Sequence, residues 1–512
     1  MKKLFIYIFS AGLLCSASSC KKSLDKQNPN GPDETNFWKT ANDALLGVNA
    51  MYGNQYRNGT FARWITVVMN PRSDDGFAST GWPPLRETVD FTLLDYNFEV
   101  IHNIWAHHYR GIYRANQVIA YVPDIQMDET LKKRYIAEAK FHRAFWYFYL
   151  VTLWGNVPLV LTPSQPSDRP AQATEEQTWA QIEKDLQEAI PDLPLSYSGP
   201  DVGRITRGAA YAMLGKAYMQ QRKWQQAVDA FQWLVEGDGK NLYDLVPNYR
   251  DNFLHTTEFN KESVFEITFK AQQSVTDEDD PNSNMGNQRG PFFGPGNGAG
   301  FNDMEMHRWV IYEFMQDSTV SGQRDPRLES TAIFDSMDVR GPDQTVIYGN
   351  TFSSMLSPTD KRVWYRKYQN DYFMTGETFE GPINVRVIRY ADVLLMYAEA
   401  LNEVNRTSDA YKYVDRVRER AGLQKLSVKK PGLSQASFRQ QIMHERITEL
   451  TGESTRWTDL ARWGYFDDPA KLNELKSRDF EFNNFVLNKS KWFPILQTEL
   501  DINPNLHQNP GY

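Results

Sequence analysis

The sequence contains little cysteine, and its N-terminal apolar run is short. Cys15 and Cys20 are the only cysteines among 512 residues. The residues after Cys20 therefore cannot form a disulfide bond with one another, even in an oxidising compartment. The apolar run Leu4–Leu14 spans about eleven residues, whereas a membrane-spanning helix needs roughly twenty. These absences exclude a disulfide-bonded scaffold and argue against a transmembrane helix in that run.

Positive charge is also scarce. The chain has 56 lysines and arginines against 64 acidic residues, a net charge of −8. Contact with nucleic-acid phosphates requires a basic stripe. The composition therefore argues against nucleic acid as a partner. It equally argues against binding of anionic lipid through a basic surface.

The N-terminal residues have the pattern of a secretory signal. Lys2 and Lys3 precede Leu4–Leu14, and the small residues Ser16–Ser19 follow it. A positive start, an apolar core and a small-residue exit are typical of a signal peptide. We predict a lipoprotein signal over residues 1–19. A buried N-terminal helix is the alternative.

Cys20 is the predicted lipidation site. Ala17–Cys20 resembles a lipobox, although the usual leucine at the third position before the cysteine is missing. We expect residues 20–31 to form a lipidated tether that holds the protein at a membrane, since each buried acyl methylene contributes about 0.8 kcal/mol. Ordinary cleavage, which would release a free protein, is the alternative.

The most specific internal motif is that of a tetratricopeptide repeat. Leu214-Gly215-x-x-Tyr218 is followed by Ala227 and Phe231, at the spacing of a 34-residue helical hairpin. Gly215 and Ala227 would let two helices approach, and the rings of Tyr218 and Phe231 would fill the groove between them. The repeat is degenerate, and an ordinary helical hairpin is the alternative.

Apolar residues recur with helical period in further segments, and Thr174 with Gln177 forms a capping-box pattern. The predicted helices are 41–55, 100–121, 131–154, 174–190, 387–404, 410–421, 434–450 and 457–463. We predict a mostly α fold with about four tetratricopeptide-like helix pairs. These pairs, over residues 41–235 and 387–463, would pack against a loop-rich irregular region over residues 236–386, all within one region 32–512.

The middle of the chain is rich in glycine, proline and rings. Gly290–Gly300 has a glycine and proline density that argues against regular elements and predicts long loops. Asp277–Asp280 is acidic enough to suggest structural calcium, but it lacks the alternating spacing of an EF-hand. A solvated acidic loop is the preferred interpretation, and no cofactor is predicted.

The last residues predict an ordered tail. Glu499–Tyr512 is polar, and Pro504 and Pro510 each remove an amide donor and favour extended backbone before them. We expect this segment to be neither a helix nor a flexible linker, but to lie across a folded surface.

Several blocks of the chain resemble the SusD/RagB family of glycan-binding outer-membrane lipoproteins. The blocks are Ser23–Asp25, Asn36–Thr40, Glu138–Ala144, Trp154–Pro158, Arg204–Ala210, Arg389–Ala400, Glu445–Leu450, Thr455–Gly464, Phe493–Ile495 and the tail. The resemblance implies a SusD-like fold and a surface protein of the outer membrane. It also implies that the protein captures an oligosaccharide and passes it to a SusC-like TonB-dependent transporter.

The candidate ligand contacts form two groups. A sugar has an apolar face that stacks on flat rings and a rim of hydroxyls that hydrogen-bond to charged and amide groups. The first group lies between the first two predicted helices, a region that contributes to the glycan site in the family, and the second lies in the loop-rich region. Core packing is the alternative for each ring. The predicted contacts are Asp74, Asp75, Trp82, Arg86 and Tyr96, then Trp309, Trp364, Tyr365 and Tyr368.

Positive evidence for catalysis is missing. Adjacent Asp74 and Asp75 generally point apart, whereas glycoside hydrolysis needs two carboxyls that face one bond. His444-Glu445 lacks the second histidine of a zinc-protease helix. We predict a binding protein and not an enzyme. A surface glycoside hydrolase and a repeat scaffold that binds only proteins remain the alternatives.

Overall fold

The computed structural model describes residues 37–271, 285–334, 346–355 and 361–512. The predicted signal peptide, the tether with Cys20 and the segment Asp277–Asp280 lie outside these residues. Within the described ranges, none of the helices is both long and apolar enough to span a lipid bilayer.

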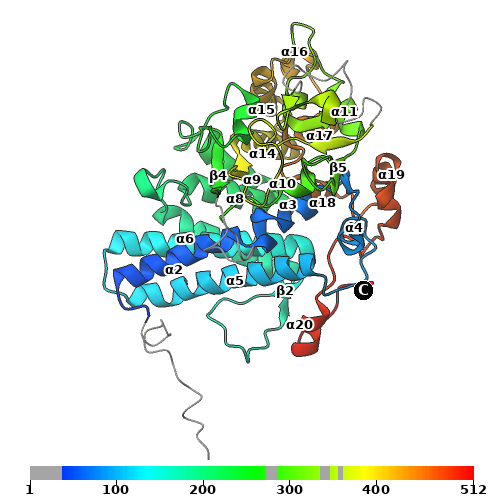
Figure 1. Ribbon diagram of the computed structural model, residues 1–512. Helices are drawn as coiled ribbons and strands as arrows, with labels where there is room; N and C mark the ends of the chain where they lie inside the picture. Colours follow the sequence, from blue (N-terminus) through cyan, green and yellow to red (C-terminus); the bar gives the residue numbers. More distant parts are fainter. Residues whose placement is uncertain (1–36, 272–284, 335–345, 356–360) are drawn as a thin grey trace, which may run out of the picture.

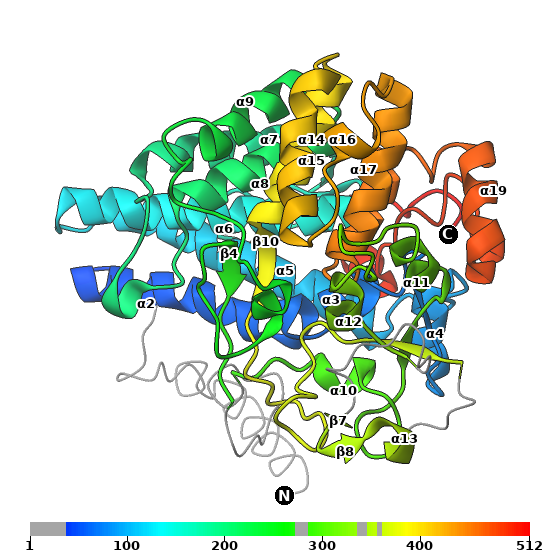
Figure 2. The same cartoon turned by 90° about the horizontal axis from the view of Figure 1, so that it is seen from above.

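Long helices dominate the described chain and confirm the mostly α fold (Figure 1 and Figure 2). The N-terminal helices α2, α5 and α6 lie together, and α14, α15 and α17 form a second group. The pairs α5–α6, α8–α9 and α14–α15 pack against each other, and α9 also contacts α14, which joins the two groups. The long helices, with α18, are α2 (Ala41–Gly53), α5 (Glu99–Tyr121), α6 (Glu129–Trp154), α7 (Glu175–Ala189), α8 (Arg207–Gln220), α9 (Trp224–Val235), α14 (Tyr390–Glu403), α15 (Thr407–Arg420), α17 (Gln435–Leu450) and α18 (Arg456–Arg462).

The predicted repeat motif forms the hairpin α8–α9. Ala227 and Phe231 are fully buried, and Tyr218 is nearly so. A Cβ atom at Gly215 would lie 2.3 Å from the ring of Phe231, so only glycine allows this approach. The close contact between the two helices therefore has the cause that the motif predicts.

Most predicted helix ends agree with the structure. The Thr174 hydroxyl accepts from the Gln177 amide, and the Gln177 side chain accepts from the Thr174 amide, which completes the predicted capping box before α7. Gly155, at φ 70°, ends α6, because glycine adopts this conformation without a Cβ clash.

The predicted helix 387–404 begins too early. Val385–Arg389 is strand β10, which pairs antiparallel with β4 (Ser263–Ile267), and α14 starts only at Tyr390. Val385, Val387 and Ile388 are β-branched and are buried against the partner strand, an environment that favours strand over helix.

The loop-rich part contains more regular structure than predicted. Its strands are short and occur in antiparallel pairs, and residues Gly290–Phe293 form one helical turn although glycine and proline density argued against it. Pro291 sits at the start of this turn, where its missing amide is tolerated. Within this part, β6 (Ala332–Phe334) pairs with β9 (Val363–Tyr365), and β7 (Val346–Ile347) pairs with β8 (Asn350–Thr351). Its strand β5 (Met304–Met306) pairs with β1 (Gly76–Ala78) from the N-terminal part, where β2 (Val157–Pro158) also pairs with β3 (Gln172–Ala173).

Short helices complete the described chain. They connect the strand pairs, the long helices and the C-terminal segment (Figure 2). They are α3 (Trp64–Met69), α4 (Pro83–Val89), α10 (Gly290–Phe293), α11 (Trp309–Phe314), α12 (Arg327–Thr331), α13 (Phe352–Met355), α16 (Leu426–Lys429), α19 (Pro469–Arg478) and α20 (Gln497–Ile502).

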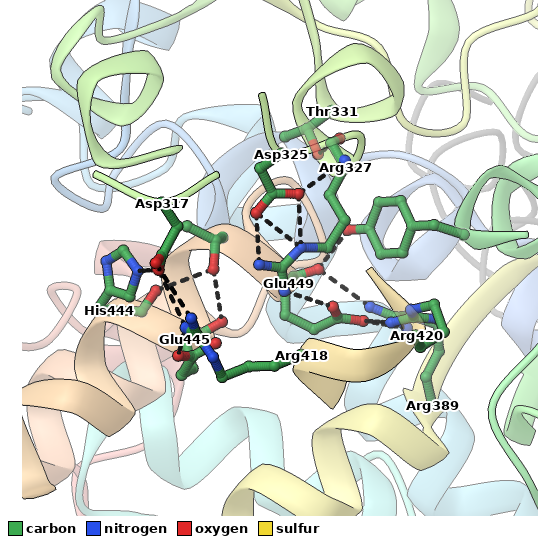
Figure 3. Close-up of polar contacts among 12 residues, drawn as sticks. Asp317, Asp325, Arg327, Thr331, Arg389, Arg418, Arg420, His444, Glu445 and Glu449 are labelled. Carbon is green, nitrogen blue, oxygen red and sulfur yellow. Dashed lines mark hydrogen bonds and ion pairs between the residues drawn. The ribbon is translucent and has the colours of Figure 1, made fainter. Parts of the chain in front are cut away.

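One buried ionic group joins the loop-rich part to the helices. The Glu449 carboxylate of α17 accepts from Arg389 of β10, Arg420 of α15 and Arg327 of α12, at 3.0, 2.5 and 3.1 Å (Figure 3). Burial alone would raise the pKa of Glu449, but these arginines outweigh it and lower the pKa to about 2. The charges are therefore paired, as a buried position requires.

The C-terminal tail lies on the fold as predicted, with one correction. Glu499–Ile502 belongs to helix α20, so the first part of the segment is helical. Beyond it, the Asn509 amide donates to the Trp154 and Phe493 carbonyls at 2.9 and 2.7 Å. The Tyr512 hydroxyl donates to the Trp492 carbonyl at 2.7 Å. Each bond satisfies a backbone carbonyl where α6 ends or where the chain approaches α20.

Candidate functional site

Asp74 forms ion pairs in the protein interior. It lies just before β1 and is fully buried. Arg456 binds both its carboxylate oxygens at 2.6 and 2.8 Å, and Arg478 approaches one of them at 2.5 Å. Burial would raise the pKa of Asp74, but the two arginines lower it to about 2. Ion pairs with these two arginines occupy the carboxylate, so it is not free to bind a ligand.

Asp75 differs from Asp74 in its protonation state. Its side chain is fully buried, and within the described residues its carboxylate oxygens have no hydrogen-bond partner. Burial, with repulsion from Asp74, raises the pKa of Asp75 to about 8. The carboxyl is therefore mainly protonated at neutral pH.

Three predicted rings of the second group also lie in the interior. Trp364, Tyr365 and Tyr368 are at most 2% exposed. Trp364 donates its indole N–H to Asn302 at 2.6 Å, and Tyr365 packs edge-on against Phe293. Neighbouring side chains cover these three rings and the two aspartates, and their contact with a ligand stays a prediction.

The two predicted groups do meet, but inside the protein. The half-buried Trp309 ring donates its N–H to the Asp74 carbonyl at 2.7 Å, and the Arg478 guanidinium lies over the ring at 5.0 Å. Tyr96 is half-buried and packs edge-on against the terminal Tyr512, with 5.6 Å between the ring centroids. Contact of Trp309 or Tyr96 with a ligand stays a prediction.

Trp82 and Arg86 of the first group face solvent. Trp82 is 37% exposed and precedes α4, where Pro83 and Pro84 set the direction of the helix. Its ring rests edge-on against the buried Phe98 and beside Trp64, at centroid distances of 5.2 and 6.3 Å. Arg86 is one turn further along α4 and is exposed.

A second exposed ring comes from the glycine-rich loop. Phe301 is 55% exposed. Its amide donates to the Pro291 carbonyl at 2.7 Å. A Cβ atom at Gly300 would lie 2.7 Å from the Cα of Gly294, so the loop closes tightly only because both positions are glycine. The loop is thus built to hold Phe301 outward.

Trp82, Phe301 and the half-buried Phe379 form a surface that we call the exposed aromatic patch. Buried rings link its members: Phe292 lies 5.1 Å from Trp64, 5.7 Å from Phe301 and 6.2 Å from Phe379. The Ser79 amide and hydroxyl donate to the Asp303 and Asn302 carbonyls at 2.8 and 2.9 Å, which holds the segment before Trp82 beside that of Phe301. The ligand contacts predicted from the sequence did not include Phe301 or Phe379. The glycine-rich run before Phe301 was the available signal.

Polar groups border the patch. Asp303 is half-buried and hydrogen-bonds to Thr80; burial raises its pKa, and the hydrogen bond opposes that shift. The Trp82 amide donates to the Thr80 hydroxyl at 3.1 Å. With Arg86, these groups place donors and acceptors beside flat rings. That combination suits a ligand with an apolar face and a hydroxyl rim.

Asp317, His444 and Glu445 are close enough to hold a metal ion, with ligand atoms within 4.8 Å of one another. Cations of the protein fill this space (Figure 3). Arg418 contacts Asp317 and Glu445 at 3.0 and 2.5 Å, and Lys429 also binds Asp317. Both His444 ring nitrogens face carboxylates, which outweigh the effect of burial and raise the pKa of His444 to about 9. These contacts describe an ion-pair cluster.

Comparison with known proteins identifies matching families over most of the chain. The model of the SusD family matches residues 261–512. A second model, described as starch-binding associating with outer membrane, matches residues 24–219.

Individual relatives match at full length. SusD-like protein P25 of Formosa agariphila is 26% identical over 100% of this chain and 99% of its own length. A SusD superfamily protein of Bacteroides vulgatus has a TM-score of 0.81 and 27% identity, covering 93% of this chain and 100% of that structure. A laminarin binding SusD-like protein has a TM-score of 0.75 and 29% identity, with the same coverage.

Proposed function

Because the chain belongs to the SusD family, we propose that it binds an oligosaccharide through the exposed aromatic patch. The observation that carries this proposal is the outward position of Trp82 and Phe301 on a rigid support of buried rings. Flat rings stack on the C–H face of a sugar without a large loss of side-chain entropy. The bordering Asp303 and Arg86 supply hydrogen bonds to hydroxyl groups.

The names of relatives support a glucan as the first ligand class to test. One structural relative at 29% identity is a laminarin binding SusD-like protein. A more distant relative by sequence, at 20% identity, is the starch-binding protein SusD of Bacteroides thetaiotaomicron. Laminarin and starch are therefore the first probes.

We further propose that the protein acts at the cell surface, anchored by an acyl group at Cys20, and delivers its ligand to a SusC-like TonB-dependent transporter. The signal-like residues 1–19 and the lipobox-like Ala17–Cys20 support anchoring. The outer-membrane association in the name of the second matching family supports the location.

Binding without bond cleavage fits the patch better than hydrolysis does. Asp74 is held in ion pairs and Asp75 is mainly protonated, and both lie below the surface. Asp303 and Arg86 border the rings, but hydrolysis needs two carboxyl groups on opposite sides of a glycosidic bond.

The test is electrophoresis in gels that contain laminarin or starch. Trp82→Ala and Phe301→Ala should each weaken retention about tenfold, the loss expected for one stacking contact. Phe259→Ala is the matched control, because Phe259 is 43% exposed and lines a different cleft. Unchanged retention in both patch variants would reject the patch as the ligand surface.

The same experiment separates the alternatives. Release of reducing sugar from the polysaccharide would favour a hydrolase. A scaffold would be favoured by two results together. The unchanged protein would not be retained by any saccharide, and the patch variants would lose binding to a protein partner.

A further inference from the structure

A cleft of about 380 Å³ lies between α2 and α5 and shares no lining residue with the exposed aromatic patch. Arg110 and Arg114 of α5 line one side. Because they are four positions apart, they lie on the same face of the helix. Phe37, Trp38 and Leu46 line the other side, at the start of the described chain. The helices that form this cleft run side by side in Figure 1.

The cleft is positive on a protein that is acidic overall. Among the described residues that line it, none is an aspartate or a glutamate. Within the described chain, neither Arg110 nor Arg114 has a carboxylate partner, and Arg114 donates only to the Ala50 carbonyl, at 2.6 Å. Burial, with repulsion from Arg57 and Arg110, lowers the pKa of Arg114 to about 10. An anion in the cleft would relieve this repulsion.

The opposite side of the cleft is apolar and firmly supported. Trp38 adopts φ 64°, and a Cβ atom at Gly47 would lie 2.3 Å from its ring, so α2 accepts the ring only because of that glycine. Phe37 packs edge-on against Trp38 at 4.9 Å. Leu46 is 49% exposed beside them. Rings and aliphatic side chains in this arrangement are typical of protein surfaces at a membrane interface.

The cleft lies close to the predicted anchor along the chain. Phe37 follows Cys20 by 17 residues, so covalent geometry limits the cleft to about 60 Å from an acylated N-terminus. A tether of this length raises the effective concentration of bilayer lipids around the cleft.

We propose that the cleft binds the phosphate of a membrane-lipid headgroup. Arg110 and Arg114 contact the phosphate, since guanidinium groups bind phosphate oxygens in a fork geometry. Phe37, Trp38 and Leu46 contact the interfacial part of the lipid. A soluble anion would gain nothing from that apolar side, so the surface favours lipid. The inference rests on the proposed acylation at Cys20 and not on carbohydrate binding.

Vesicle cosedimentation tests the proposal with a chain that begins at residue 21 and therefore lacks Cys20 and its acyl group. We expect binding to vesicles of equal phosphatidylcholine and phosphatidylglycerol, and weak binding to phosphatidylcholine alone. Arg110→Ala with Arg114→Ala should reduce binding to the anionic vesicles by about fivefold for each arginine. Binding should also fall with added salt.

The matched control is Arg406→Ala with Arg416→Ala. It removes the same charge from α15 and from the residue before it, far from α2 in Figure 1, where each arginine pairs with an exposed carboxylate. An equal loss in this control, or equal binding to both vesicle types, would overturn the proposal. Binding of inorganic phosphate that depends on Arg110 and Arg114, without vesicle binding, would assign a soluble anion and also overturn it.

Glycan retention distinguishes this failure from a failure of the proposed function. Laminarin gels should retain the double variant at Arg110 and Arg114 as strongly as they retain the unchanged protein. Trp82→Ala should bind vesicles normally.

Discussion

At the residue scale, neighbouring carboxyl groups differ because of what surrounds each of them. Asp74 faces Arg456 and Arg478, whereas the oxygens of Asp75 have no hydrogen-bond partner among the described residues. The first pKa falls to about 2 and the second rises to about 8. Both residues therefore affect stability with opposite dependence on pH.

Asp75→Asn should stabilise the protein at alkaline pH. The folded state holds a proton on Asp75 that the unfolded chain releases above about pH 4, so stability falls as pH rises toward about 8 and then levels off. The amide does not titrate, and we expect a gain of about 1–3 kcal/mol above pH 8 and little change near pH 4. Urea unfolding across this pH range measures the effect.

Asp74→Asn is the matched comparison. The lowered pKa of Asp74 gives stability that is present above its ordinary value and is lost as pH falls toward about 2. At neutral pH its loss leaves Arg456 and Arg478 without their partner, at a cost of about 3–5 kcal/mol. Destabilisation by Asp75→Asn at every pH would contradict the assignment.

At the element scale, glycine decides how closely the repeat helices pack. Gly215 of α8 lies under the Phe231 ring of α9. Leu214, Tyr218, Ala227 and Phe231 are all buried in the same core. The repeat motif was visible in the sequence because its spacing is local, and the structure confirms the pair.

Gly215→Ala should destabilise the protein by about 1–3 kcal/mol, because the added methyl group overpacks the contact with Phe231. Gly53→Ala is the control. Gly53 ends α2 at φ −57°, and a Cβ atom there meets nothing within 4 Å. That substitution should be neutral or stabilising by about 0.4–1 kcal/mol. Thermal unfolding of both variants checks the difference, and equal midpoints would refute the packing argument.

At the scale of the whole molecule, distant segments hold each other in place. Glu449 binds arginines from β10, α15 and α12 (Figure 3). Asn509, close to the C-terminus, satisfies the Trp154 carbonyl at the end of α6. Both arrangements join the helical and irregular parts of the fold, and neither has a counterpart in local sequence.

Asn509→Ala should lower the free energy of unfolding by about 2–3 kcal/mol, because it leaves the buried Trp154 and Phe493 carbonyls without a donor. Asn505→Ala is the control: Asn505 donates to the exposed Arg169 carbonyl at 2.7 Å, and its loss should cost less than about 1 kcal/mol. Equal urea midpoints for the two variants would show that the tail is not held through Asn509.

Elements that depend on neighbours along the chain could be predicted from the amino-acid sequence. Helix periodicity, the Thr174 capping box, the Gly155 stop and the repeat spacing each act within a few residues, so they were predicted almost to their boundaries. Matching blocks spread over the chain identified its family for the same reason. Val385–Arg389 was one exception, because β10 exists only against its partner strand β4. The helical residues Gly290–Phe293 and Glu499–Ile502 were the others.

Which of these residues reach the surface depends instead on how distant segments pack in the folded protein. Trp82 and Trp364 were both predicted as ligand contacts, yet Trp82 is 37% exposed before α4 and Trp364 is buried in β9. Net charge likewise argued against a basic surface, but folding places Arg110 and Arg114 in a cleft whose described lining residues include no acid. The burial of a side chain and the clustering of charges depend on contacts between segments that are far apart in the chain. The residues next to each position therefore do not predict them.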